Sequence, residues 1–315
     1  MHTFQWNSFS YFFSAHSTQF FLKNCYRKRG IELADQKAYE NCYPFIYYIE
    51  HGKIYYEQAK IAPLIIKPIL LFYGLVHLIK ACILTVDPNY PETTSVLAHG
   101  VSTRKRKKQQ YSFVLDEVKF QKTGLFPFVA EKLFHMKHLE GDKISMGSLL
   151  KQVPELSDLV LQFEGKPSFA EVNQNGEEFS IPKHVLDVFH MTENRFIDFF
   201  LSKSMENFSH QRSEDQSLIF NKKGSDYLPL KYDLSNKSFA LPLTKGIGLQ
   251  FHELIIHYLL LYNLSMIARY ETEWWSELVK TMPNQDYPLI DNFLYITTEK
   301  GPYLVHHFLD KAASK

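Results

Sequence analysis

The stretch FHELIIHYLLLYNLSMIARYETEWW, residues 251–275, carries the strongest structural signal in this chain. Apolar side chains recur at steps of three and four residues across residues 251–268, which predicts a helix buried around most of its circumference. The positions that follow combine charges with large rings, in Arg269, Tyr270, Glu271, Glu273, Trp274 and Trp275. We therefore expect a central helix that ends at a polar boundary. Nothing in this stretch indicates a chemical reaction.

The composition is that of a globular protein with a substantial core. Its 315 residues are 45% hydrophobic and 15% aromatic, enough for one large or two ordinary domains. The 35 basic and 34 acidic side chains leave a net charge of +1. Since no long-range field draws such a chain to a polyanion, we expect neither nucleic acid nor a membrane as its partner.

The cysteines and the N-terminus indicate the cytoplasm. Cys25, Cys42 and Cys82 are far apart and form no CxxC pair, which favours free thiols in a reducing compartment. The first residues have neither a basic segment nor a clean apolar segment of the kind found in signal peptides. We therefore expect the chain to begin here as the mature protein.

Two segments invite a membrane interpretation. Residues 61–86 are long enough to span a bilayer, but Lys67, His77, Lys80 and two prolines interrupt them, so a buried soluble helix is favoured. Pro68 is expected in the first turns of that helix, where proline is tolerated. The aromatic N-terminal segment has almost no Lys or Arg before Lys23, so it would attract lipid only weakly.

The pattern along the chain predicts a mainly α fold of the α+β class. We expect helices over residues 34–42, 68–84, 184–205, 248–279 and 303–313, with residues 43–56 either a turn around His51–Gly52 or a loop. An Asn-Gly turn between residues 169–172 and 179–181 predicts a β-hairpin. Helical regions 1–150 and 246–315 would pack together, with a mixed region, 151–245, between them.

Two candidate contact surfaces stand out. The first follows His99 and is a run of five cations, Arg104, Lys105, Arg106, Lys107 and Lys108. Such a run could bind an acidic protein or a nucleotide, or could simply be a solvated loop. The second comprises Arg269, Tyr270, Glu271, Trp274 and Trp275. It is either a hot spot for a protein partner or a helix end with an Arg269–Glu273 ion pair and packed tryptophans.

No motif identifies a metal or cofactor site. His252 and His257 are five residues apart, which turns their rings about 140° away from each other on a helix. His135 and His138 lack a third ligand nearby, and no phosphate-binding glycine loop or hydrolase elbow is present. We expect neither cofactor nor metal, and a binding role is favoured over catalysis.

Several of these features together resemble the YaaC-like family of Gram-positive, spore-forming bacteria. The resemblance covers essentially the whole chain and depends on Trp6, on Tyr73-Gly74-Leu75, on His99-Gly100 and on residues 263–275. It implies no reaction. The family's genes tend to lie beside that of IMP dehydrogenase, which implies a link to guanine-nucleotide metabolism and makes that enzyme a candidate partner.

The long apolar helix with a following His-Gly is also similar to the helical HEPN superfamily. Nuclease members of that superfamily have an arginine followed by a histidine four to six residues later, and here His99 and Arg104 stand in the reverse order. The resemblance therefore implies at most a non-catalytic HEPN-like core.

The leading hypothesis is a cytoplasmic protein-interaction or regulatory module. The alternative is an enzyme acting on RNA or a nucleotide, in which the fold brings His99, Arg104 and Glu271 together.

Overall fold

The structure is a computed structural model and describes residues 5–103 and 111–314. The chain divides into two compact units, of which one, the mixed unit, comprises residues 147–256. The other, the helical unit, combines residues 5–103 and 111–146 with residues 257–314. The boundaries lie within α5 (Met146–Leu150) and at the start of α9 (Glu253–Tyr270), so the mixed unit is inserted into the sequence of the helical one.

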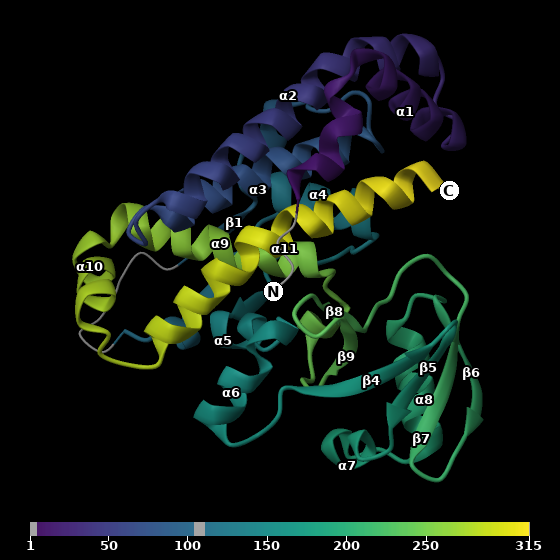
Figure 1. The fold of residues 1–315 in the computed structure, drawn as a ribbon, viewed down its shortest axis with the longest axis vertical. Helices are drawn as coiled ribbons and strands as arrows, with labels where there is room; N and C mark the ends of the chain where they lie inside the picture. Colours follow the sequence, from purple (N-terminus) through teal and green to yellow (C-terminus); the bar gives the residue numbers. More distant parts are fainter. Residues whose placement is uncertain (1–4, 104–110, 315) are drawn as a thin grey trace. The chain divides into compact units, whose positions relative to one another are not determined.

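The helical unit is built from segments at both ends of the chain. Its helices are η1 (Trp6–Phe13), α1 (Ala15–Lys28), α2 (Ala34–Ile61), α3 (Lys67–Leu84), η2 (Thr94–Leu97), η3 (Phe113–Leu115), α4 (Leu125–Phe134), most of α9, α10 (Thr272–Thr281) and α11 (Asp286–Ser314). A short antiparallel sheet joins β1 (Val101–Thr103), β2 (Glu117–Phe120) and β3 (Lys143–Ser145). The last helix, α11, packs on α1, α2 and α3 (Figure 1). The predicted packing of N- and C-terminal helical regions is confirmed.

Two glycines allow α2 and α3 to pack closely. A Cβ at Gly52 would lie 2.5 Å from Cδ2 of Leu78, and one at Gly74 would lie 2.8 Å from Cδ2 of Tyr56. The expected turn or loop around His51–Gly52 is therefore wrong. Gly52 lies within α2, where the absence of a side chain lets α3 approach, and α2 continues to Ile61.

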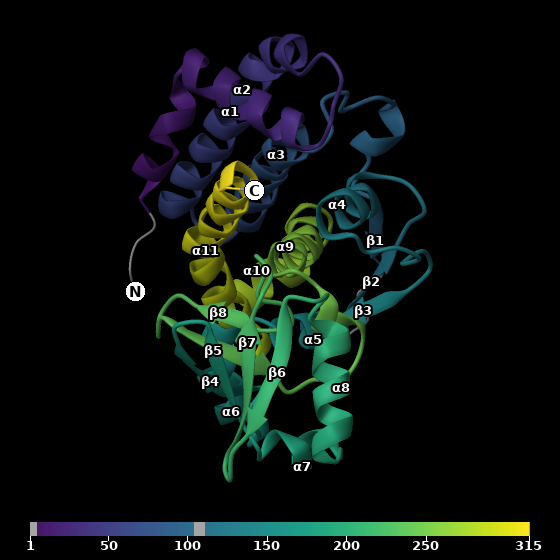
Figure 2. The same cartoon turned by 90° about the vertical axis from the view of Figure 1, so that its right-hand side faces the viewer.

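The mixed unit consists of a six-stranded antiparallel sheet with helices beside it. Its elements are the rest of α5, η4 (Pro154–Leu156), α6 (Ser157–Glu164), β4 (Phe169–Asn175), β5 (Glu178–Pro182), α7 (Val185–Phe189), α8 (Glu193–Lys203), β6 (Phe208–Ser213), β7 (Ser217–Lys222), β8 (Lys231–Asp233), β9 (Ser238–Pro242) and η5 (Ile247–Gln250). The strand order is β6-β7-β5-β4-β9-β8. Figure 2 shows α8 beside β6 and β7, where Phe200 packs on Phe220 with ring centroids 4.4 Å apart. The predicted β4–β5 hairpin is confirmed, with Gly176 at φ 61° in its turn.

Two predicted helices are each divided in the structure. The helix expected over 184–205 becomes α7 and α8, because His190 adopts left-handed backbone angles between them. The helix expected over 248–279 becomes η5, α9 and α10. Residues 251–252 separate η5 from α9, and Glu271 leaves helical geometry with φ −120° and ψ 49° between α9 and α10.

One described helix, α3, is long and apolar enough to span a bilayer, but two thirds of it is buried within the protein. Pro68 lies in its first turn, as predicted. Cys25, Cys42 and Cys82 are free and buried, which agrees with the prediction of unpaired thiols.

Candidate functional site

The helical unit brings together His99 and Arg269, which were predicted as parts of two separate surfaces. Nη1 of Arg269 donates a hydrogen bond to the hydroxyl of Tyr73 over 3.1 Å, and its guanidinium lies 5.7 Å from the centre of the Tyr73 ring. The imidazole of His99 lies 6.3 Å from the same ring and 5.5 Å from the ring of Tyr262. Tyr73 therefore links the two predicted residues.

The backbone on either side of His99 holds it in place. Its carbonyl oxygen accepts hydrogen bonds from the Tyr258 hydroxyl at 2.8 Å and from the Phe126 amide at 3.1 Å. The next residue, Gly100, has φ 77°, and a Cβ there would lie 2.4 Å from Cδ of Pro127. Only glycine fits this position, which explains the His-Gly pair seen in the sequence.

One face of α3 extends this site. Tyr73, His77 and Lys80 recur at steps of four and three residues, so their side chains share a face about 10 Å long. The ring of Tyr55, from α2, stacks on His77 at 5.6 Å, and the His51 ring approaches its edge at 5.2 Å. We call the whole set the basic aromatic cluster: Tyr48, His51, Tyr55, Tyr73, His77, Lys80, His99, Tyr262, Arg269 and Tyr270.

The surroundings of His77 and His99 favour the neutral form of each imidazole. Burial, followed by the charge of Lys80 and the neighbouring His51, lowers the pKa of His77 from 6.5 to about 4. Burial, followed by the charges of Arg269 and Lys80, also lowers the pKa of His99. The Nδ1 atom of His77 is buried and has no hydrogen-bond partner within the described chain. Burial is the larger cause at both histidines, and the nearby cations add to its effect.

Neither cation of the cluster has a carboxylate partner among residues 5–103 and 111–314. Lys80 lies over the ring of Tyr48 at 5.7 Å, and burial lowers the pKa of its amine. Arg269 donates to the Ser265 carbonyl oxygen and the Tyr73 hydroxyl, and lies over the ring of Tyr270 at 5.2 Å. Taking a cation out of water without a counter-charge is unfavourable. An anion bound between these groups would supply the missing charge.

The two tryptophans have different environments, and only one has an exposed surface. Trp275 is 1% exposed and its indole donates to the carbonyl oxygen of Ile65 over 2.9 Å, so it is a core side chain and not a contact residue. Trp274 is half-buried and meets the Tyr111 ring edge-on at 4.6 Å. Tyr270 is 67% exposed and is the ring of this region most available to another molecule.

Two further sequence expectations are resolved differently. Arg269 makes no ion pair with Glu273, because the chain leaves helical geometry at Glu271 between them. Glu271 is half-buried at the start of α10, and no hydrogen bond or ion pair within the described residues joins its carboxylate to His99 or Arg269. The basic run of Arg104, Lys105, Arg106, Lys107 and Lys108 lies outside the described residues.

Sequence reasoning missed the members of the cluster that come from α2 and α3. His77 and Lys80 were noticed only as polar interruptions of an apolar segment. Their signal is the spacing of Tyr73, His77 and Lys80, which places three polar groups on one face of a helix that is otherwise apolar. Among the described residues, no group of three His, Cys, Asp or Glu side chains could hold a metal ion.

Comparison with known proteins gives one result. The family model described as YaaC-like Protein matches residues 10–309. No curated protein and no solved structure matches the chain. None of these comparisons supports similarity to the HEPN superfamily. Because the family model spans nearly the whole sequence, this chain belongs to the YaaC-like family.

Proposed function

We propose that this protein is a regulatory module that binds a phosphate-bearing ligand, a nucleotide, at the basic aromatic cluster. The observation that carries the proposal is that Lys80 and Arg269 are half-buried and have no carboxylate partner in the described chain. Both cations lower the pKa of the same imidazole, that of His99, so both act on the same part of the cluster. Phosphate is the common biological anion for which arginine and lysine are the usual partners.

The aromatic rings of the cluster suit the base of a nucleotide. Tyr270 is exposed next to Arg269, and Tyr55 is half-buried against His77. Such rings offer flat surfaces on which a base can stack while the cations hold the phosphates. The link to guanine nucleotides, IMP dehydrogenase as a protein partner and a cytoplasmic location remain parts of this proposal; the first two are supported only by the resemblance described above.

Calorimetric titration tests the proposal. We expect affinity to fall in the order GTP, GMP, guanosine, because each lost phosphate removes contacts to the cations. Lys80→Gln and Arg269→Gln should each weaken GTP binding by about 10-fold or more, the usual effect of removing a charged hydrogen-bond partner. Lys122→Gln, at an exposed position, is the matched control and should change nothing. Guanosine binding as tightly as GTP would refute the phosphate assignment.

One observation favours the enzymatic alternative. His99 is held neutral by burial beside Arg269, and a neutral imidazole next to a cation can accept a proton from a nucleophile. If the protein hydrolyses GTP or an RNA oligonucleotide, His99→Gln should abolish turnover while binding persists. Absence of product from the wild-type protein over a long incubation would dismiss this alternative.

A further inference from the structure

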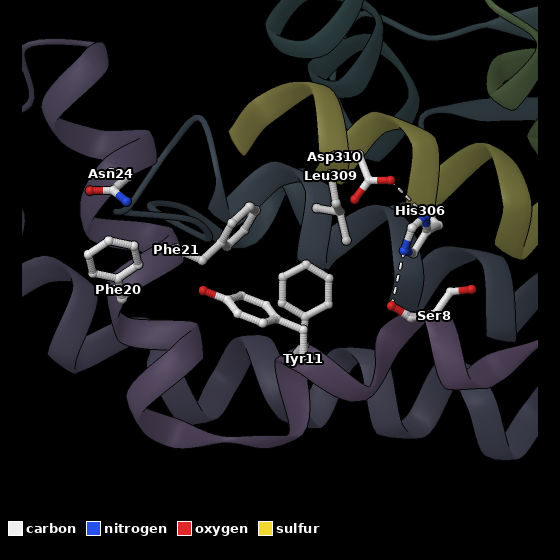
Figure 3. A pocket seen from close by; sticks show the side chains of 9 residues that line it. Ser8, Tyr11, Phe20, Phe21, Asn24, His306, Leu309 and Asp310 are labelled. Carbon is white, nitrogen blue, oxygen red and sulfur yellow. Dashed lines mark hydrogen bonds and ion pairs between the residues drawn. The ribbon is translucent and has the colours of Figure 1, made fainter. Parts of the chain in front are cut away.

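A concavity elsewhere in the helical unit has chemistry different from that of the basic aromatic cluster. It has a volume of about 330 Å³, within the range of small-molecule sites, and lies between η1, α1 and α11 (Figure 3). Nine residues line it, among them the rings of Tyr11, Phe12, Phe20 and Phe21 and the polar side chains of His306 and Asp310.

The rings form walls that meet at steep angles. Tyr11 and Phe12 lie 5.5 Å apart at 80°, and Phe12 and Phe21 lie 4.9 Å apart at 67°. A flat base needs parallel rings to be sandwiched, whereas a rounded cation can contact the faces of several rings that are steeply inclined to each other. The geometry therefore favours a compact cation over a nucleobase.

Two rings at the rim remain exposed although they border a concavity. Tyr11 is 50% exposed and Phe20 is 57% exposed, while the rings of Phe12 and Phe21 form the buried floor. Large aromatic rings that stay exposed around a hollow are typical of a site that another molecule covers.

The charges of the lining agree with this choice. None of the nine lining residues is Lys or Arg, and Asp310 supplies a carboxylate. Nδ1 of His306 lies 3.0 Å from that carboxylate, and Nε2 donates to the carbonyl oxygen of Ser8 at 3.0 Å (Figure 3). Because the Asp310 side chain is 59% exposed, a cationic ligand can still approach it.

We propose that this pocket, lined by Tyr11, Phe12, Phe20, Phe21 and Asp310, binds a small quaternary ammonium compound. The rings contact its methyl groups and attract its charge through their faces, and the carboxylate of Asp310 balances that charge. The site is independent of the basic aromatic cluster, whose charge selects the opposite kind of ligand.

The test compares choline with 3,3-dimethylbutan-1-ol, which has the same shape but no charge, by titration of the full chain. We expect choline to bind at least about 10-fold more tightly, and Tyr11→Leu and Phe20→Leu to weaken choline binding about 3- to 10-fold each. Asp310→Asn should weaken choline but not the neutral compound. Tyr39→Leu removes a still more exposed ring, at 70%, that lies outside the pocket, and should have no effect.

Sulfate should not compete with choline, since it would occupy the other site. Equal affinity for choline and its neutral analogue, or choline binding that is unchanged in both ring variants, would overturn the proposal. The wild-type comparison decides the question even if a variant folds poorly.

Discussion

The hydroxyl of Tyr73 accepts a hydrogen bond from Nη1 of Arg269 over 3.1 Å, and this contact joins the first half of α3 to the last turn of α9. It holds the guanidinium in one orientation before any ligand arrives. Because the orientation is already fixed in the folded protein, no conformational entropy of this side chain has to be lost again on binding. The pair therefore explains why a cation with no counter-charge has a defined position.

We expect Tyr73→Phe to weaken GTP binding about 3- to 10-fold, because the ring remains while the orienting hydroxyl is lost. The free energy of unfolding should change by less than about 1.5 kcal/mol, since the bond is only partly buried. Tyr295→Phe, at a ring that is 61% exposed, is the control. Titration calorimetry and urea unfolding measure the two quantities. Unchanged affinity in Tyr73→Phe would show that Arg269 needs no such support.

The affinity for an anion should rise as the pH falls. The pKa of His77 is lowered from 6.5 to about 4 and that of His99 is also lowered, so both are mainly neutral near pH 7 in the free protein. A bound anion favours the protonated forms and raises both pKa values, so binding takes up protons and is stronger at lower pH.

Sulfate is the right probe for this effect, because it does not itself titrate between pH 5 and 8. Its affinity should increase steadily over that range as the pH is lowered, and the increase should shrink in His77→Gln and His99→Gln. A flat profile in the wild-type protein would mean that the ligand does not contact the histidines.

Gly52→Ala should destabilise the helical unit by about 1–3 kcal/mol, the usual cost of overpacking. The new methyl group would lie 2.5 Å from Cδ2 of Leu78, which is fully buried. The double variant Gly52→Ala with Leu78→Ala should lose less than the sum of the two single variants, because the smaller side chain makes room. Strictly additive losses in urea unfolding would argue against this contact.

Trp275→Ala should destabilise the protein by about 3–5 kcal/mol, as expected for loss of a fully buried large ring. It also leaves the carbonyl oxygen of Ile65 without the indole donor. Trp274→Ala should cost clearly less, because that ring is only half-buried. A stable Trp275→Ala protein with weakened binding of a protein partner would reinstate the surface role that the sequence suggested.

Patterns within short stretches of sequence predicted those helices and strands that are determined by neighbouring residues alone. The period of the apolar residues identified α9, the position of Pro68 identified the start of α3, and the turn sequence before Gly176 identified the β4–β5 hairpin. The length of α2 could not be predicted this way. Gly52 looks like a turn residue in the sequence. Only the position of Leu78 on the neighbouring helix shows that glycine is needed there for close packing.

The candidate site was predictable only in parts. His99 and Arg269 were each singled out from the sequence, yet they are separated by 170 positions, and what joins them is Tyr73. His77 and Lys80 were interpreted only as interruptions of an apolar helix. Tertiary contacts between α2, α3 and α9 decide which polar residues face each other, and no pattern within a single segment contains that information.

The insertion of residues 147–256 between the two parts of the helical unit affects the order of folding during synthesis. The mixed unit is continuous in sequence, so it can fold as soon as it has left the ribosome. The helices α1 to α3 leave the ribosome earlier but must wait for α11, which packs against all three. The apolar surface that α11 covers on these helices therefore stays exposed while about two hundred further residues are made. Molecular chaperones would have their main opportunity to bind the nascent chain during that interval.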